Sequence, residues 1–185
     1  SNFVYTSPDG ITWTRRSVPT AFPMRSLQYT GAGFLAPTSS TPSGEYMLST
    51  DGLLWSRIQI IGNLHATPAA LTFGGGRYVM AGSAPDTLLT SSDGTTWTRT
   101  GPSRLFNFIA VAASSNAVVA VGNDSFIYSS TDGSTWASHA TDQARGFNDV
   151  TFAAGIFVAV GVDGAIFTSP DGATWSTRGP LRPLR

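Results

Sequence analysis

Few side chains in this 185-residue chain are suited to acid–base or metal chemistry. Ten of its eleven acidic residues are aspartates, and Glu45 is the only glutamate. Glycoside hydrolysis needs two carboxyl groups that flank the scissile bond, and no independent partner for Glu45 can be nominated. Cysteine is absent, and the two histidines, His65 and His139, are far apart in the sequence. We therefore expect no catalytic residue, no metal site and no cofactor.

Three arginines occur at equivalent positions after tryptophans and could bind a ligand. Arg15, Arg57 and Arg99 each follow a tryptophan by two residues. Such a band could grip carboxylates or sulfates through bidentate hydrogen bonds. The alternative is that these arginines place charge on outer strands, where charge discourages pairing with other chains.

Two asparagines form a second set of candidates. Asn107 and Asn148 stand in the segments Phe106-Asn107-Phe108 and Phe147-Asn148-Asp149, which we expect to open equivalent first strands. Equivalent polar side chains could bind the same ligand at several points, or could cap a loop in each repeat.

The elements that must position these residues follow from an internal repeat. The pattern Ser-x-Asp-Gly-x-x-Trp occurs five times, and successive tryptophans lie 42, 42, 39 and 39 residues apart. A fixed period near 40 residues indicates a repeat architecture. The five copies are Ser7-Asp9-Gly10-Trp13, Ser49-Asp51-Gly52-Trp55, Ser91-Asp93-Gly94-Trp97, Ser130-Asp132-Gly133-Trp136 and Ser169-Asp171-Gly172-Trp175.

Local chemistry predicts a hairpin turn at each copy. Pro8 presets the backbone for the first central position of a type I turn, and the carboxylate of Asp9 can accept bonds from nearby amides. Gly10 supplies the left-handed residue that joins such a turn to two twisted strands. Strand residues precede each turn, and a short strand led by tryptophan follows it. Gly74-Gly75-Gly76 is read as a hairpin turn and not as a phosphate loop, because no helix follows it.

The residues around the turn predict four strands per repeat. In the clearest copy, strands are expected over 149–153 and 156–161, with two further strands that flank Asp171-Gly172. Four antiparallel strands in about 40 residues form the unit of a β-propeller blade. No segment shows a sustained apolar period of 3.6 residues, so we predict an all-β propeller with essentially no helix.

The repeat resembles the Asp-box, or bacterial neuraminidase repeat, whose usual form is Ser-x-Asp-x-Gly-x-Thr-Trp. Five matches cover nearly the whole chain. Propellers with this repeat include sialidases, other glycan hydrolases, sortilin-type receptors and photosystem II assembly factors. Asp and Gly are adjacent here, which resembles a variant of repetitive bacterial and phage proteins. The resemblance implies a structural turn on the rim of each blade, between the third and fourth strands, and does not by itself imply hydrolysis.

Strand counting predicts five blades, of which the first is incomplete. Five outer hairpins occur, but only four inner hairpins, which begin near Arg25, Ala69, Phe108 and Asp149. We divide the single propeller domain into a half blade over 1–20, repeats over 21–65, 66–105, 106–145 and 146–180, and a tail over 181–185. Three interpretations follow. The chain could form a closed five-bladed ring that includes the half blade, or a ring completed by strands of another copy or chain. It could also be a fragment of a longer propeller.

Composition restricts the class of partner. The formal charge is zero and the pI is near 6.7, which gives no general attraction to nucleic acid. No apolar run approaches the ~20 residues of a membrane span. A cysteine-free chain rich in Ser, Thr and Gly suits the extracellular space or a virion surface, and it would also fit the cytoplasm. The tryptophans are expected to pack between blades, although exposed ones could stack on sugars.

We therefore expect a non-catalytic binding module. The first hypothesis is multivalent recognition of glycans or another surface ligand by similar loops around the ring. The second is a protein-interaction or assembly scaffold, or a fragment or engineered repeat without a natural ligand. A sialidase-like hydrolase is the third, and it would depend on Glu45, which stands just before a third strand.

Overall fold

The five predicted turns are formed by one set of side-chain bonds. The computed structural model describes residues 2–31, 33–39, 44–61, 67–83, 88–102, 107–141 and 146–179. In every turn, the aspartate Oδ1 accepts two backbone N–H groups, two and three residues ahead, at 2.7 to 2.9 Å. The serine hydroxyl donates to the same carboxylate. The glycine that follows has a positive φ between 68° and 79°, as the sequence predicts.

These turns connect the outer strands of five antiparallel sheets. The first sheet has two strands, β1 (Asn2–Thr6) and β2 (Thr14–Val18). The next two sheets are β3 (Gln28–Tyr29), β4 (Phe34–Pro37), β5 (Glu45–Ser49) and β6 (Ser56–Gln59), then β7 (Pro68–Gly74), β8 (Arg77–Gly82), β9 (Leu88–Ser91) and β10 (Thr98–Arg99). The last two are β11 (Phe108–Ala113), β12 (Val118–Gly122), β13 (Phe126–Ser130) and β14 (Ala137–Ala140), then β15 (Phe147–Ala153), β16 (Ile156–Gly161), β17 (Ile166–Ser169) and β18 (Ser176–Thr177).

The structure confirms an all-β propeller with four four-stranded blades and one half blade. The first strand that the sequence places near Arg25 begins later, at Gln28, and has only two residues. Within the described part of the chain, the only helical segment is one 3-10 turn, η1 (Val162–Gly164), at a predicted turn.

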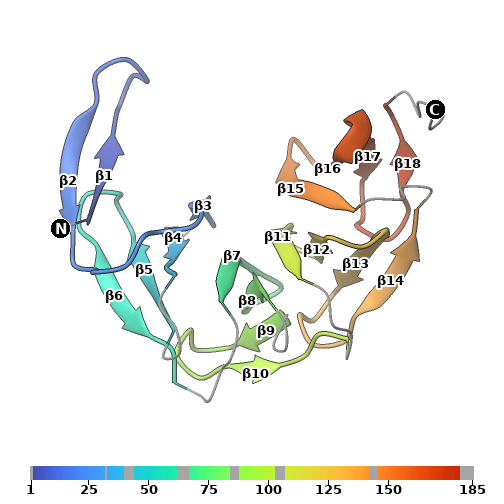
Figure 1. Cartoon of the computed structure of the whole chain (residues 1–185), viewed down its shortest axis with the longest axis horizontal. Coiled ribbons are helices and arrows are strands. Elements are labelled where there is room, and N and C mark those ends of the chain that lie inside the picture. The colour runs from blue at the N-terminus through green and yellow to red at the C-terminus, as the bar shows by residue number, and fades with distance from the viewer. Residues whose placement is uncertain are drawn as a thin grey trace.

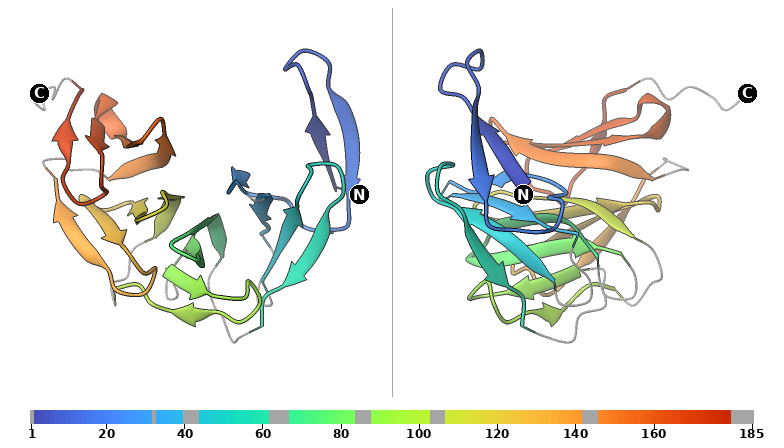
Figure 2. Two further views of the ribbon diagram at one scale, coloured as in Figure 1. Left: turned by 180° about the vertical axis from the view of Figure 1, so that it is seen from behind. Right: turned by 60° about the vertical axis from the view of Figure 1, so that its left-hand side comes forward.

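The sheets stand side by side in an open arc (Figure 1). β3, β7, β11 and β15 line the concave side, and β2, β6, β10, β14 and β18 lie on the outside. The hairpin β1–β2 and the last sheet stand at opposite ends of the arc, as the two views in Figure 2 also show. The five units therefore do not form a closed ring, which corrects the first of the three closures that the sequence allows.

Apolar side chains between neighbouring sheets form the core. One cluster joins Leu35 and Tyr46 of one blade to Leu71, Met80 and Trp97 of the next. Trp97 is 6% exposed, and its Nε1 donates to the Gly94 carbonyl at 3.0 Å.

The burial of the motif tryptophans differs along the arc. Trp97 is buried, whereas Trp55, Trp136 and Trp175 pack on clusters of their own and are half-buried. Trp13 has no preceding blade and is 59% exposed. The predicted packing between blades is therefore correct inside the arc and wrong at Trp13.

Candidate ligand-binding hollow at the inner strands

The inner strands carry aromatic side chains at one repeated position. Tyr29, Phe73 and Phe152 each stand at or near the end of an inner strand and pair with the residue five positions later, across the first hairpin of the blade. The third complete blade places Ala113 at this position, opposite Val118. The topology thus brings three equivalent rings to one end of the concave side.

A cavity of about 440 Å³ lies between these positions, which we call the axial hollow. All four complete blades contribute to its wall: Gln28 and Tyr29 from the first, Phe73 from the second, Ser114 from the third and Phe152 from the fourth. Among the described residues, none that lines the hollow is charged. Its wall combines polar residues, such as Gln28, Thr72 and Ser114, with aromatic ones. The hollow therefore suits an uncharged ligand that has both apolar faces and hydrogen-bonding groups.

The rings of the hollow are held by cross-strand aromatic pairs. Ring centroids are 5.0 Å apart for Tyr29 and Phe34, and 4.6 Å apart for Phe152 and Phe157. Such pairs fix side-chain orientation on a sheet. Tyr29 nevertheless remains 60% exposed, which leaves much of its side chain accessible to a ligand.

The three predicted arginines lie on outer strands and do not reach this hollow. Arg15, Arg57 and Arg99 occupy β2, β6 and β10, and each pairs with the equivalent residue of the neighbouring strand. The Arg15 guanidinium carbon lies 4.1 Å from the ring centroid of Phe3, a cation–π distance. Their surroundings therefore differ from blade to blade, and whether they bind anions stays a prediction.

The two asparagines are not equivalent, contrary to the sequence interpretation. Phe108 pairs with Gly122 as Phe147 pairs with Gly161, so Asn148 corresponds to Ile109 and not to Asn107. The cause is the 39-residue spacing, which aligns Phe147 with Phe108 and not with Phe106. Phe106 and His65 lie outside the described residues.

Asn107 borders a smaller cavity, and Asn148 is exposed on β15. The backbone N–H of Asn107 donates to Asn123 Oδ1 at 3.1 Å. The cavity, of about 230 Å³, also involves Arg25 and Ile109, at the opposite end of the inner strands from the axial hollow. The side chain of Asn148 is exposed to solvent.

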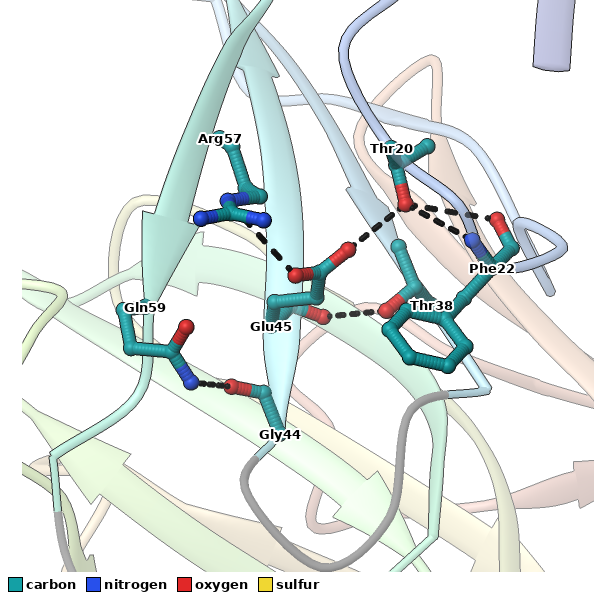
Figure 3. Close-up of polar contacts among 7 residues, drawn as sticks. All are labelled: Thr20, Phe22, Thr38, Gly44, Glu45, Arg57 and Gln59. Carbon is teal, nitrogen blue, oxygen red and sulfur yellow. Dashed lines mark hydrogen bonds and ion pairs between the residues drawn. The ribbon is translucent and has the colours of Figure 1, made fainter. Parts of the chain in front are cut away.

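Glu45 has a structural environment (Figure 3). Its side chain is almost fully buried, and Oε1 accepts a hydrogen bond from Thr20 Oγ at 2.6 Å. Arg57 Nε lies 3.7 Å from Oε2, and the backbone carbonyl accepts a bond from the Thr38 hydroxyl. Because Thr20 also bonds to Phe22, the carboxylate fastens the segment after the half blade to β5.

The turn aspartates are held as carboxylates by backbone amides. The N–H groups of Thr12 and Ile11 lower the pKa of Asp9 to about 2, and those of Thr174 and Ala173 do the same for Asp171. The pKa of Asp93 is lowered in the same way by Thr96 and Thr95. Such carboxylates cannot act as general acids near neutral pH.

Other titratable side chains of the described residues form isolated hydrogen-bonded pairs. His139 shares a 2.7 Å hydrogen bond with Ser129, and the Tyr128 hydroxyl donates to Asp124 at 2.7 Å. No cluster of three or more His, Asp or Glu side chains that could hold a metal ion occurs among the residues described above. No helix in the described ranges is long and apolar enough to cross a membrane.

Sequence reasoning missed the aromatic residues of the hollow. The available signal was the pairing of bulky residues five positions apart across the first hairpin of each repeat, as in Tyr29 with Phe34 and Phe73 with Tyr78. The turns between them differ in sequence, which hid the repeat.

Comparison with solved structures finds propellers at low identity. The structure of YCF48 bound to a D1 peptide is 22% identical, with a TM-score of 0.62, over 94% of this chain and 59% of that chain. A streptogramin B lyase structure is 10% identical, with a TM-score of 0.75, over 98% of this chain and 63% of that one. The virginiamycin B lyase of Staphylococcus aureus is 10% identical, with a TM-score of 0.73, over 98% and 64%.

The comparisons define the fold and family of the chain. It spans about three fifths of the length of the YCF48 and lyase structures, at identities that show the fold alone. A search of curated proteins finds no match. The family model described as the DUF6242 beta propeller domain matches residues 34–149, well over half of the sequence, and the chain therefore belongs to that family.

Proposed function

We propose that the chain is a non-catalytic binding module that takes an uncharged saccharide in the axial hollow. The observation that carries this proposal is the repeated aromatic position, which places Tyr29, Phe73 and Phe152 around one uncharged cavity. Sugar rings present apolar C–H faces and many hydroxyls. Aromatic faces beside serine, threonine and glutamine side chains complement both kinds of surface.

The non-catalytic part of the proposal is supported by the state of the carboxylates. Glycosidases place two carboxyl groups on either side of the scissile bond. In the part of the chain that the structure describes, no acidic residue lines the axial hollow. Glu45 is bonded to Thr20, and each turn aspartate is bonded to backbone amides within its own loop. The repeated bonds of the turns also favour a structural motif of the Asp-box kind.

A binding experiment with a matched pair of variants tests this proposal. Neutral oligosaccharides are screened on an array, and hits are measured by calorimetry with Tyr29→Ala and Tyr5→Ala. Both tyrosines are more than half exposed, but only Tyr29 lines the hollow. Loss of one stacked ring should weaken binding about fivefold for Tyr29→Ala and leave Tyr5→Ala unchanged. An array without hits, or equal effects of both variants, contradicts the proposal.

The second candidate function is a protein-interaction scaffold. A propeller similar over 94% of this chain was solved with a bound peptide, which favours a polypeptide ligand for this fold as well. Exposed apolar side chains on and beside the half blade, such as Tyr5, Trp13 and Leu27, support it independently. Capture of a defined protein that is lost in Trp13→Ser but kept in Tyr29→Ala would favour this function over the first.

A further inference from the structure

Three inner strands carry a β-bulge at one repeated position, at the end opposite the axial hollow. In β7 the extra residue is Ala69, which stands between Pro68 and Ala70, and these two pair with consecutive residues of β8. Ile109 of β11 and Asn148 of β15 are the extra residues at the same place. A bulge bends its strand and redirects a side chain, and bulges are frequent beside binding sites. The repeat thus supplies a position whose side chain changes from blade to blade while the strand pairing stays the same.

Arg25 occupies this position in the first complete blade. The Pro23 carbonyl accepts the N–H of Ser39 at 2.9 Å, and the Thr67 carbonyl accepts the equivalent bond of the next blade at 3.3 Å. Arg25 and Ala69 each follow that carbonyl by two residues. The four equivalent side chains are therefore a guanidinium, a methyl group, a branched aliphatic group and an amide. Within the described residues, the Arg25 side chain has neither an ion pair nor a hydrogen bond.

Arg25, Ala69 and Ile109 meet in the cavity of about 230 Å³ that Asn107 borders, which we call the bulge cavity. β7 and β11, which carry two of these residues, stand side by side on the concave side (Figure 1). Phe108 also lines the cavity. Ile109 is 40% exposed, so a ligand in the cavity would cover apolar surface that is now in contact with water.

The polar groups of the bulge cavity suit an anion. Ser83 Oγ accepts the N–H of Thr67 at 3.1 Å, and within the described residues its own hydrogen has no acceptor. Among the described residues of the wall none is acidic, and Arg25 is the one that carries a charge. A guanidinium and a carboxylate form two parallel charge-assisted hydrogen bonds, which are stronger than neutral ones. The wall therefore combines one cationic group with apolar surface and no opposing charge.

We propose that the bulge cavity binds a small carboxylate with a compact, branched apolar body. Arg25 binds the carboxylate, and Ala69 and Ile109 contact the body. The volume is below the range of about 300–1,000 Å³ that is usual for drug-sized ligands, which restricts the ligand to a short body. A free short-chain acid and the terminal residue of a polypeptide both present this chemistry. The proposal does not rest on saccharide binding, because no described residue lines both cavities.

Isovalerate and isovaleramide form a matched pair of probes, because they have the same branched body and differ in charge. Their dissociation constants are measured on the full chain by titration, with the backbone amides followed by NMR. Isovalerate should bind at least about tenfold more tightly than isovaleramide, because only the carboxylate forms charge-assisted bonds. Its binding should shift the amide signals of Ala69 and Ile109 and leave that of Phe152, in the axial hollow, unchanged.

Two variants exchange residues among the equivalent positions. Arg25→Ala introduces the residue type of Ala69, and Ile109→Asn introduces that of Asn148. Arg25→Ala should weaken isovalerate binding at least about tenfold, and Arg178→Gln should change it less than about twofold, because Arg178 is exposed outside the cavity. Ile109→Asn should weaken isovalerate binding about fivefold and leave the binding of acetate, which lacks the branched body, unchanged.

A third probe, N-acetyl-L-valine, distinguishes the two sources of the ligand. It is isovalerate with an acetamido group on the carbon beside the carboxylate, as at the end of a polypeptide. Tighter binding than isovalerate supports the site with a chain terminus as its ligand, and weaker binding supports the site with a free acid. Absent binding of both acids, equal binding of isovalerate and isovaleramide, or equal effects of Arg25→Ala and Arg178→Gln would overturn the proposal.

Discussion

The first and third turn hairpins have the same internal bonds and very different surroundings. Asp9 and Asp93 each accept two backbone amides at 2.8 and 2.7 Å. Yet Trp97 is buried and Trp13 is mostly exposed, and Leu89 is buried where the equivalent Tyr5 is 54% exposed. The turn is therefore a local property of its sequence, whereas burial is supplied by the preceding blade. This division is typical of repeat proteins, whose stability combines units and interfaces.

The largest difference between the two hairpins is expected when each tryptophan is replaced by alanine, because only one of the two rings is packed between blades. Trp97→Ala removes a buried ring between two blades and should lower the free energy of unfolding by about 3–5 kcal/mol. Trp13→Ala removes a ring that is already largely in water, and should cost less than about 1 kcal/mol. Urea denaturation of both variants measures the difference. Equal losses would show that the N-terminal hairpin is as tightly packed as the interior.

Replacing two turn glycines by alanine compares the same two kinds of surroundings at nearly equal backbone geometry. Gly10 and Gly172 have φ values of 73° and 79°, so either substitution strains the turn by about 1 kcal/mol. At Gly172 the new methyl group also meets Val119, whereas at Gly10 it meets nothing within 4 Å. Gly172→Ala should therefore cost about 1–3 kcal/mol more than Gly10→Ala in thermal unfolding. A cost at Gly10 that matches the cost at Gly172 would contradict this account.

The Glu45 network tests how the half blade is attached to the arc. Glu45→Ala leaves the buried Thr20 hydroxyl without its carboxylate acceptor and should cost about 2 kcal/mol. Glu45→Gln keeps an acceptor for Thr20 and should cost less. Limited proteolysis near residue 20 should accelerate in the alanine variant and not in Leu54→Glu, an exposed control. Unchanged proteolysis would show that the carboxylate does not hold this segment.

Acid should lower the stability of all five turns. The effect should be gradual and smaller than the effects of the substitutions above. The pKa of Asp9, Asp132 and Asp171 is about 2 in the folded chain, and an unfolded aspartate titrates near 4. A lowered folded pKa gives stability that is complete above about pH 4 and is lost as pH falls toward 2. The melting temperature should fall over that interval, and less steeply in Asp171→Asn. A melting temperature that stays constant from pH 5 to pH 2 would exclude a role for these carboxylates.

The sequence predicts what is local and repeated in this fold. Ser169, Asp171 and Gly172 indicate a turn whose bonds need no distant partner, so its geometry could be derived from residue types. The four-strand blades follow from the same repeat. By contrast, the bond between Thr20 and Glu45 joins residues 25 positions apart, and nothing in either local sequence announces it.

The candidate site was harder to predict than the fold, for a physical reason. The axial hollow gathers residues from four blades, so its aromatic lining is visible only once the inner strands lie side by side. The arginines and asparagines that stand out in the sequence are instead spread over outer strands and strand ends. Repeated spacing thus identified the structural positions of the turns, and the binding roles of the arginines and asparagines stay predictions.

Native-state hydrogen exchange, resolved by NMR, compares the two regions most directly. β1 is the equivalent of β13, but β13 is bonded on both edges and packed between blades, whereas β1 is bonded on one edge. The amides of β13 should exchange only through global unfolding, and those of β1 through local opening that is far more frequent. Equal, high protection in both strands would contradict the claim that preceding blades, and not the turns, provide the stability of each unit.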